Sequence, residues 1–506
     1  MSNWIRCVVL AIGWISIEPF WEVGQAQEPF VAKSLETSQI GRYWHELDRD
    51  DQVPIGISVS TSADDKELPS LEERLLELEK RSAESDAKLQ SFQDSTKKAK
   101  TDAAKLPSLT INGAFQVDGV MFNQDDASRE AYGRIESGAD FRRARLGAKG
   151  SLSDRMDYFF QMDFAFFGRP TFTDLWADFK DVGPLGTIRV GQWKQPFSLE
   201  AVSSYRYTTF MERAGVFQAF VPFRHIGLGF YDHSKDLNWT WAASYLRTGQ
   251  DQFAGSLSTN EGNGLAGRLT HLLWYGGQDG SEYCHMGLGY FLNAPPNGGL
   301  RVRSIPEIFV GEFSVLPTDL QGSSAVPIAT VVQGTPFFVD TGLLQQVSLV
   351  NTYGTEALLV HGPISWQSEG MWQHLDTASV GNALLWGGYT QVGYFLTGEH
   401  RPYDRKAGAI DRVKPSHSVS KNGGLGAWEV AMRWSYLDLT DRQIRGGDME
   451  NITFGLNWFV NANCKCVFNY IHIQADSRKT RGGVIDGNEL IASTTDAYGI
   501  RCQVDF

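Results

Sequence analysis

From residue 107 to its last residue, the chain repeats an apolar–polar alternation with a period of two. The final segment, AYGIRCQVDF (497–506), places tyrosine, isoleucine, cysteine, valine and phenylalanine at every second position, with small or polar residues between them. Free C-termini are usually polar and frayed. Strict alternation up to a terminal aromatic residue therefore predicts a strand with one apolar face and one polar face.

The apolar faces of these segments are rich in aromatic residues, whereas the opposite faces carry charged and amide side chains. WEVAMRWSY (428–436), ITFGLNWFV (452–460) and DYFFQMDFAF (157–166) all follow this pattern. A membrane barrel places such apolar faces against lipid and lines a wet lumen with the polar ones. Closure of the sheet satisfies every backbone group, and the last strand then pairs with the first. We therefore predict an all-β fold, a transmembrane β-barrel with antiparallel strands.

The length of this region fixes the approximate number of strands. Residues 107–506 number 400, and strands of about 10 residues with their turns and loops use roughly 25 residues each. The prediction is about 16 strands, enough for an aqueous channel. The predicted loops are 123–138, 256–264, the stretch around 317–336, and 399–424.

The first 106 residues are of a different kind. Residues 1–26 combine Arg6, an apolar run over 7–17 and small residues before position 27, which predicts a secretory signal peptide. Residues 27–67 are an acidic linker without periodicity. Residues 68–106 carry a 4-3 frame of apolar residues that begins with Leu71, Leu75 and Leu78 and predicts a coiled-coil helix. The barrel domain is 107–506, and the predicted location is the outer membrane of a Gram-negative-type envelope.

Composition excludes several classes of function. The formal charge is −13, which argues against a nucleic-acid partner. The five cysteines show no metal-ligand spacing, and we expect no metal and no cofactor. Nucleophile-elbow, zinc-protease and phosphate-loop motifs are absent from the sequence, so we expect no enzyme.

A series of motifs in one order resembles the phosphate-selective porin O/P family. They are FRRARLGAKG (141–150) with the strand after it, GTIRVGQWKQPFSLE (186–200), FMER (210–213), RHIGLGF (224–230), GRLT (267–270), LTGEHRPY (396–403), KP (414–415), GAWEVAMRWS (426–435) and the closing strand. The resemblance covers roughly 107–506. It implies a 16-stranded barrel, a homotrimer, and passive diffusion of small anions such as phosphate.

The barrel domain holds 33 basic and 40 acidic residues, a net charge of 33 − 40 = −7, so anion selectivity requires local placement of cations. Alternation points Arg143, Arg145, Arg189, Arg268, Arg433 and Arg501 into the lumen. The resemblance adds Arg142, Ser204, Arg206 and Arg213 to the anion pathway. Arg suits an oxyanion because its planar fork donates two parallel hydrogen bonds. Two positions depart from the family pattern: Ala201 replaces a lysine and Ala114 an arginine, which leaves open a broader anion pore or another solute.

Three alternatives remain open at this stage. Each arginine in the lumen has a second interpretation, an ion pair with a lumen carboxylate that braces the wall. The coiled coil ahead of a barrel also allows a structural tether between the outer membrane and the cell wall. A secreted β-rich enzyme is the third alternative, with a carboxylate pair such as Glu369 and Asp376.

Overall fold

The computed structural model describes residues 106–506 except 166–169, 250–261, 312–333, 380, 421–422 and 482–483, together with Lys80, Lys88 and Gln90. The predicted signal peptide and linker lie outside the described residues. The predicted coiled coil does too, apart from Leu106 and the three isolated positions, which are helical. These three assignments therefore stay predictions.

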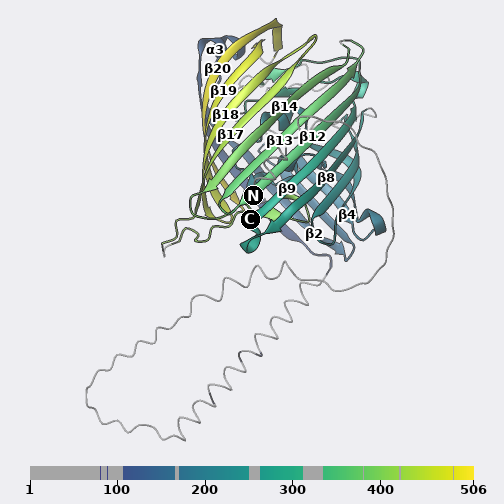
Figure 1. Cartoon of the computed structure of the whole chain (residues 1–506), viewed down its shortest axis with the longest axis vertical. Coiled ribbons are helices and arrows are strands. Elements are labelled where there is room, and N and C mark those ends of the chain that lie inside the picture. The colour runs from purple at the N-terminus through teal and green to yellow at the C-terminus, as the bar shows by residue number, and fades with distance from the viewer. Residues whose placement is uncertain are drawn as a thin grey trace, which may run out of the picture. The chain divides into compact units, whose positions relative to one another are not determined.

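The described part of the chain forms a closed barrel of sixteen antiparallel strands, as predicted (Figure 1). In order around the barrel, the strands are β1 (Thr110–Gln124), β2 (Gly138–Ser153), β3 (Met156–Asp163), β4 (Thr171–Phe179), β5 (Thr187–Lys194), β6 (Arg224–His233), β7 (Trp239–Arg247), β8 (Asn263–Gly276), β9 (Glu282–Ala294), β12 (Val347–His361), β13 (Ile364–Thr377), β14 (Ala383–Phe395), β17 (Ala427–Asp441), β18 (Ile444–Asn461), β19 (Cys464–Arg481) and β20 (Val484–Asp505). The seam joins β20 to β1. The backbone of Phe506 extends it, exchanging hydrogen bonds of 3.0 and 3.1 Å with Gly113.

The strands place apolar residues outside and polar residues inside. On β17 and β19, the outward Met432 and Phe468 are both 45% exposed, whereas Arg433 faces inward and is 1% exposed. A soluble sandwich would show the reverse. The inverted arrangement predicted from the alternation is confirmed.

The remaining elements lie in the connections between strands. They are helices α3 (Asp126–Tyr132), α4 (Leu199–Val202) and α5 (Gly215–Phe220), the 3-10 turns η2 (Gly183–Leu185), η3 (Tyr205–Tyr207), η4 (Gln278–Gly280) and η5 (Pro296–Gly298), and the two-residue pairs β10 (Arg303–Ser304) with β11 (Val339–Asp340) and β15 (Tyr403–Asp404) with β16 (Ala409–Ile410). Asp125 caps α3, because its side chain accepts a hydrogen bond of 2.6 Å from the backbone N–H of Ser128. Among the described helices, none has the length and apolar content that a bilayer span requires.

Three connections are much longer than the rest. We call 195–223 the inner loop, 295–346 the long loop and 396–426 the terminal loop. The terminal loop lies at the end of the barrel where β1 begins and β20 ends, which we call the terminal end; the other two leave the opposite end. The predicted loops at 123–138 and 399–424 are confirmed, as 125–137 and as part of the terminal loop. The other two predicted loops lie mostly outside the described residues.

These loops fill much of the lumen with a packed interior. Phe197 and Phe210 of the inner loop are fully buried, as are Ile308 and Phe338 of the long loop. In the terminal loop, Tyr403 and Ile410 pack in one apolar cluster with Leu199 of the inner loop. Segments that enter from the two ends of the barrel therefore meet inside it, and cavities remain between them and the wall.

Candidate functional site

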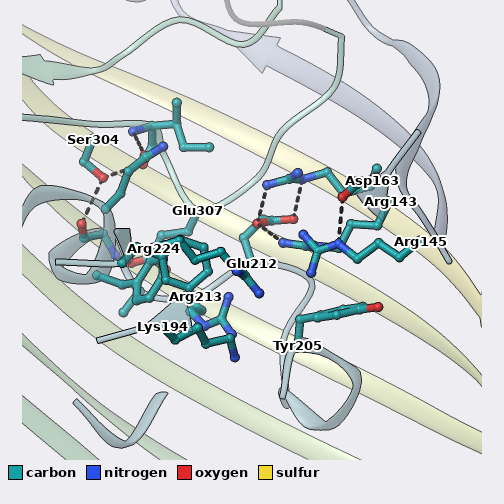
Figure 2. A pocket seen from close by; sticks show the side chains of 17 residues that line it. Arg143, Arg145, Asp163, Lys194, Tyr205, Glu212, Arg213, Arg224, Ser304 and Glu307 are labelled. Carbon is teal, nitrogen blue, oxygen red and sulfur yellow. Dashed lines mark hydrogen bonds and ion pairs between the residues drawn. The ribbon is translucent and has the colours of Figure 1, made fainter. Parts of the chain in front are cut away.

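A narrow cavity of about 60 Å³ lies where the inner and long loops face β2, β3, β5 and β6 (Figure 2). Two adjacent arginines reach it from β2 because the strand has a bulge. Gln116 pairs with Arg143 and Val117 with Phe141, so Arg142 is the extra residue on β2. Arg142 and Arg143 thus both line the cavity, which simple alternation does not allow.

Glu212 of the inner loop binds these arginines. Its carboxylate accepts two hydrogen bonds from Arg142, of 2.9 and 3.0 Å, and lies 3.6 Å from Arg143. Arg501 of β20 donates to the same carboxylate at 2.8 Å and also pairs with Asp118 at 2.5 Å. The three arginines fix Glu212, and with it the tip of the inner loop, against the wall.

The ring of Tyr205 lies beside three cations, of which Arg143 is one. The guanidinium of Arg145 lies 4.4 Å from the ring centroid, that of Arg143 at 5.1 Å and that of Arg206 at 5.3 Å. Aromatic faces attract cations, so the ring stabilises a group of like charges that would otherwise repel one another. Arg145 also pairs with Asp163 at 2.7 Å.

Arg213 and Lys194 differ from the other cations of the cavity because they bond to carbonyl oxygens. Arg213 donates to the carbonyls of Glu200 and Ser203 at 2.8 and 3.2 Å, and Lys194 donates to that of Ser203 at 2.8 Å. Within the described part of the chain, no carboxylate oxygen lies within 4.0 Å of either group. Burial lowers the pKa of Arg213 to about 10, so it stays charged at neutral pH. Carbonyl oxygens therefore orient both side chains, and no carboxylate neutralises the charge of Arg213.

The residues that line the narrow cavity carry a local excess of positive charge. Six are cations, Arg142, Arg143, Arg145, Lys194, Arg213 and Arg224, and three are acids, Asp163, Glu212 and Glu307, which gives 6 − 3 = +3. The barrel domain as a whole is negative. The lining of the narrow cavity is therefore positive within a negative barrel domain.

A second, wide cavity of about 600 Å³ lies on the terminal side of the inner loop. Its lining includes Arg189 near the start of β5, Tyr231 near the end of β6 and Lys406 of the terminal loop. Lys194, Tyr205 and Arg224 line both cavities. The two cavities thus follow one another along the lumen and meet at these three residues.

Buried carboxylates on the wall hold the backbone of the inner loop. Glu369 of β13 accepts hydrogen bonds from the N–H groups of Leu199 and Glu200, at 3.0 and 2.8 Å, and from the hydroxyl of Tyr389 at 2.6 Å. Glu307 of the long loop accepts from the N–H of Gly215 at 2.7 Å. The inner loop is therefore fixed at both of its short helices, which holds its side chains in place around the narrow cavity.

We expect Glu369→Ala to loosen the inner loop, because two buried N–H groups lose their acceptor. A buried donor left without a partner costs about 1–3 kcal/mol, so amide hydrogen exchange in peptides from 195–223 should become roughly tenfold faster. Glu450→Ala is the control, since Glu450 bonds to the outward-facing Trp434. Equal exchange rates in the two variants would contradict the anchoring role.

The family model described as phosphate-selective porin O and P matches residues 110–506. The chain belongs to this family. An uncharacterized protein of Caulobacter vibrioides is 27% identical over 369 residues, which cover 69% of this chain and 65% of that protein. Porin O of Pseudomonas aeruginosa is 28% identical over 152 residues, which cover 28% of this chain and 34% of that protein. The chain thus spans less than two thirds of the length of either relative.

Solved porin structures are similar to this chain at low sequence identity. An anion-selective porin from Comamonas acidovorans has a TM-score of 0.47 at 12% identity, covering 79% of this chain and 99% of that porin. The trimer form of OmpT from Vibrio cholerae has a TM-score of 0.44 at 11% identity, with the same coverage.

Most of the residues predicted for the anion pathway of this porin O/P family member line the two cavities. Arg142, Arg143, Arg145 and Arg213 line the narrow one, and Arg189, Ser204, Arg206 and Arg268 line the wide one. The hydroxyl of Ser204 also accepts a hydrogen bond of 3.3 Å from the N–H of Arg206. Arg433 lines neither cavity, because it is buried behind the inner loop against Glu307 at 2.5 Å.

Most of these arginines also fit their second interpretation, an ion pair with a lumen carboxylate that braces the barrel wall. Ion pairs with lumen carboxylates are formed by Arg142, Arg143, Arg145, Arg189, Arg268 and Arg433. Arg206 differs, since its guanidinium donates to the carbonyl of Gly113 at 3.4 Å. Arg213 likewise donates to backbone carbonyls, those of Glu200 and Ser203. Among the described residues, these two arginines are the members of the predicted set without a carboxylate within 4.0 Å.

Four residues that line the narrow cavity were not predicted from the sequence: Lys194, Tyr205, Glu212 and Arg224. Lys194 and Arg224 lie within the motifs that carried the resemblance, at the strand ends that flank the inner loop. The two alanines that depart from the family pattern are both buried, Ala114 on β1 and Ala201 in α4. Neither lines the cavities. The described residues contain no group of three His, Cys, Asp or Glu side chains suited to a metal ion.

Proposed function

We propose that this protein is an outer-membrane porin that lets small anions, with oxyanions such as phosphate among them, diffuse passively through its lumen. One observation carries the proposal: Lys194, Arg206 and Arg213 lie along the two connected cavities and bond to backbone carbonyls. Family membership and the closed barrel support the porin and its place in the outer membrane. Membrane lipid and a homotrimeric assembly are the partners that we propose from the family.

The selectivity for anions depends on whether a carboxylate or a backbone carbonyl binds each cation. An arginine in an ion pair offers an anion little net charge, whereas a cation fixed by a carbonyl dipole keeps its full charge. An anion passing the junction of the cavities therefore gains attraction from Lys194 and Arg213, and it can exchange the carbonyl partners for its own oxygens. The lack of cations at Ala114 and Ala201 fits a pore for small anions as a class.

The test is the reversal potential of the full chain in a planar bilayer under a KCl gradient. We expect chloride to be preferred over potassium. Removal of one cation from the constriction at Arg213→Ala should lower the permeability ratio roughly fivefold, which corresponds to about 1 kcal/mol of screened interaction.

Arg442→Ala is the matched control, because Arg442 is an exposed residue of the turn between β17 and β18. It should leave the ratio unchanged. A preference for potassium in the unmodified protein would overturn the proposed function, and equal effects of the two substitutions would overturn the role of Arg213. Repeating the measurement with phosphate reports on the solute.

A further inference from the structure

The wide cavity has an aromatic wall, which is unusual for the lumen of a barrel. Phe159 of β3 and Trp176 of β4 are directly opposite each other in register, and their ring centroids lie 5.7 Å apart. Tyr231 of β6 also lines the cavity. All three rings belong to inward-facing positions and are half-buried. They offer apolar ring surface inside an otherwise charged passage, with the planes of Phe159 and Trp176 inclined at 55°.

Cations surround this wall. The guanidinium of Arg189 lies 3.7 Å from the ring centroid of Trp176 and 5.0 Å from that of Tyr231, and it pairs with Asp178. Arg206 and Lys406 line the same cavity without a carboxylate within 4.0 Å among the described residues. The wall therefore combines surface for a ring with charge for an acid group.

The two cavities differ in what they can admit. An apolar cavity of about 150 Å³ is enough to hold benzene. The wide cavity, at about 600 Å³, exceeds this volume, and the narrow cavity, at about 60 Å³, falls short of it. A ring-bearing anion that enters from the terminal end therefore fits the first chamber and stops at the junction with the second.

We propose that the wide cavity binds small organic anions that carry an aromatic ring, and that such an anion blocks the pore when it enters from the terminal end. The ring packs against Phe159 and Trp176, and the acid group faces the cations. This inference rests on the proposed function, because it takes the lumen as an anion path.

The experiment compares benzoate with acetate as blockers of chloride current through single channels of the full chain, each added to one side of the bilayer at a time. Benzoate should reduce the current from one side only. Acetate has the same acid group but no ring, and it should block at least about fivefold more weakly, since aromatic contacts of this kind typically contribute on the order of 1 kcal/mol.

Two variants assign the block to the aromatic wall. Phe159→Leu removes a ring with little loss of volume, and Trp176→Ala removes the larger one; each should weaken the block by benzoate severalfold. Trp386→Leu is the control, because Trp386 is exposed on the outer face of the barrel. The comparison of benzoate with acetate uses the unmodified protein, so it does not depend on whether the variants fold.

The outcomes separate this proposal from the function on which it rests. A chloride-selective channel that benzoate does not block, or blocks equally from both sides or no better than acetate does, overturns the aromatic site and leaves the porin intact. A channel without preference for chloride overturns the proposed function itself.

A separate observation concerns two thiols on the outer surface. Cys466 of β19 and Cys502 of β20 are directly opposite in register, and their Sγ atoms lie 3.3 Å apart. Both are close to the terminal end, because β19 begins at Cys464 and β20 ends at Asp505. Trp458 is the next residue in the same row and stacks on Trp428 at 5.4 Å. Such aromatic rows mark the membrane–water boundary.

We infer that Cys466 and Cys502 form a disulfide that joins the last two strands. Directly opposed residues of antiparallel strands have the separation that a disulfide needs, and exported proteins meet an oxidising compartment. Each thiol first loses its proton. One thiolate attacks the disulfide of a thiol–disulfide oxidant, whose S–S bond breaks: one oxidant sulfur leaves as a thiolate and the other forms a mixed disulfide with the protein. The second protein thiolate attacks the protein's sulfur in that mixed disulfide, and the oxidant leaves with the two electrons and takes up two protons to become a dithiol.

The test is mass spectrometry of the protein extracted from membranes with a thiol-blocking reagent present throughout. We expect a linked peptide pair containing Cys466 and Cys502, with Cys464 alkylated as the internal reference. Cys502→Ser should leave Cys466 alkylated. Alkylation of both thiols in the unmodified protein, or a link between two copies of the chain on a non-reducing gel, would overturn the inference.

Discussion

Replacement of residues 399–424 by a short glycine–serine turn should raise the single-channel conductance up to about twofold, because it removes one of the three long segments that narrow the aqueous channel of a 16-stranded barrel. The terminal loop closes much of that space from the terminal end. It contacts Arg268 through the carbonyl of Gly408 at 2.7 Å, and the N–H of Ile410 bonds to the hydroxyl of Ser203 at 3.0 Å. The measurement is the conductance in symmetrical KCl.

The deletion requires two compensating changes. Arg401 of the terminal loop pairs with the fully buried Glu429 of β17. Arg412 of the same loop pairs with the buried Asp505 of β20. Because a buried carboxylate without its partner destabilises a fold strongly, the deletion is best combined with Glu429→Gln and Asp505→Asn. A difference in migration between unheated and heated protein on a detergent gel shows that the barrel has folded. A folded variant with unchanged conductance would show that the terminal loop does not obstruct the pore.

Glu212→Ala should have the largest effect on stability of any single substitution in the constriction. It leaves Arg142, Arg143 and Arg501 facing one another around an empty position. Removal of one partner from a buried ion pair costs about 3–5 kcal/mol, so we expect a loss of about 3 kcal/mol in the free energy of unfolding by urea. In any channels that form, the preference for chloride should increase, because the loss of the Glu212 carboxylate makes the net charge of the narrow cavity's lining more positive by one.

The control is a surface ion pair of similar geometry. Lys479 and Glu130 lie 3.0 Å apart, and the side chain of Glu130 is 60% exposed. Exposed pairs contribute about 0–1 kcal/mol, so Glu130→Ala should change the unfolding free energy little. If both substitutions destabilise the protein equally, Glu212 does not hold the loop as inferred.

The sheet could be predicted from the sequence because its signal is local. Each strand of a membrane barrel meets lipid on one face and the lumen on the other, so the side on which Phe468 or Arg433 lies follows from its own neighbours in the chain. The number of strands followed from the chain length, because strand length is set by the bilayer. The same logic placed Arg143, Arg145 and Arg189 inside.

The interior could not be predicted in the same way. The inward course of the terminal loop depends on partners far along the chain, such as Glu429 and Ser203, which no local pattern identifies. Arg142 faces inward through a bulge that shifts the register by one residue. Trp176 interrupts the usual polar lining, and Glu212 acts through three arginines on two strands. These features arise from tertiary contacts rather than from periodicity.

Strand β20, which closes the barrel by pairing with β1, also contacts the loops inside the lumen. Along β20, Arg501 donates to the carbonyl of Met211, Gln503 donates to that of Arg206, and Asp505 pairs with Arg412 of the terminal loop. These bonds exist at the seam only while the inner segments are in place. A change that removes part of the inner loop or the terminal loop to widen the passage therefore also weakens the contacts that hold the last strand in position.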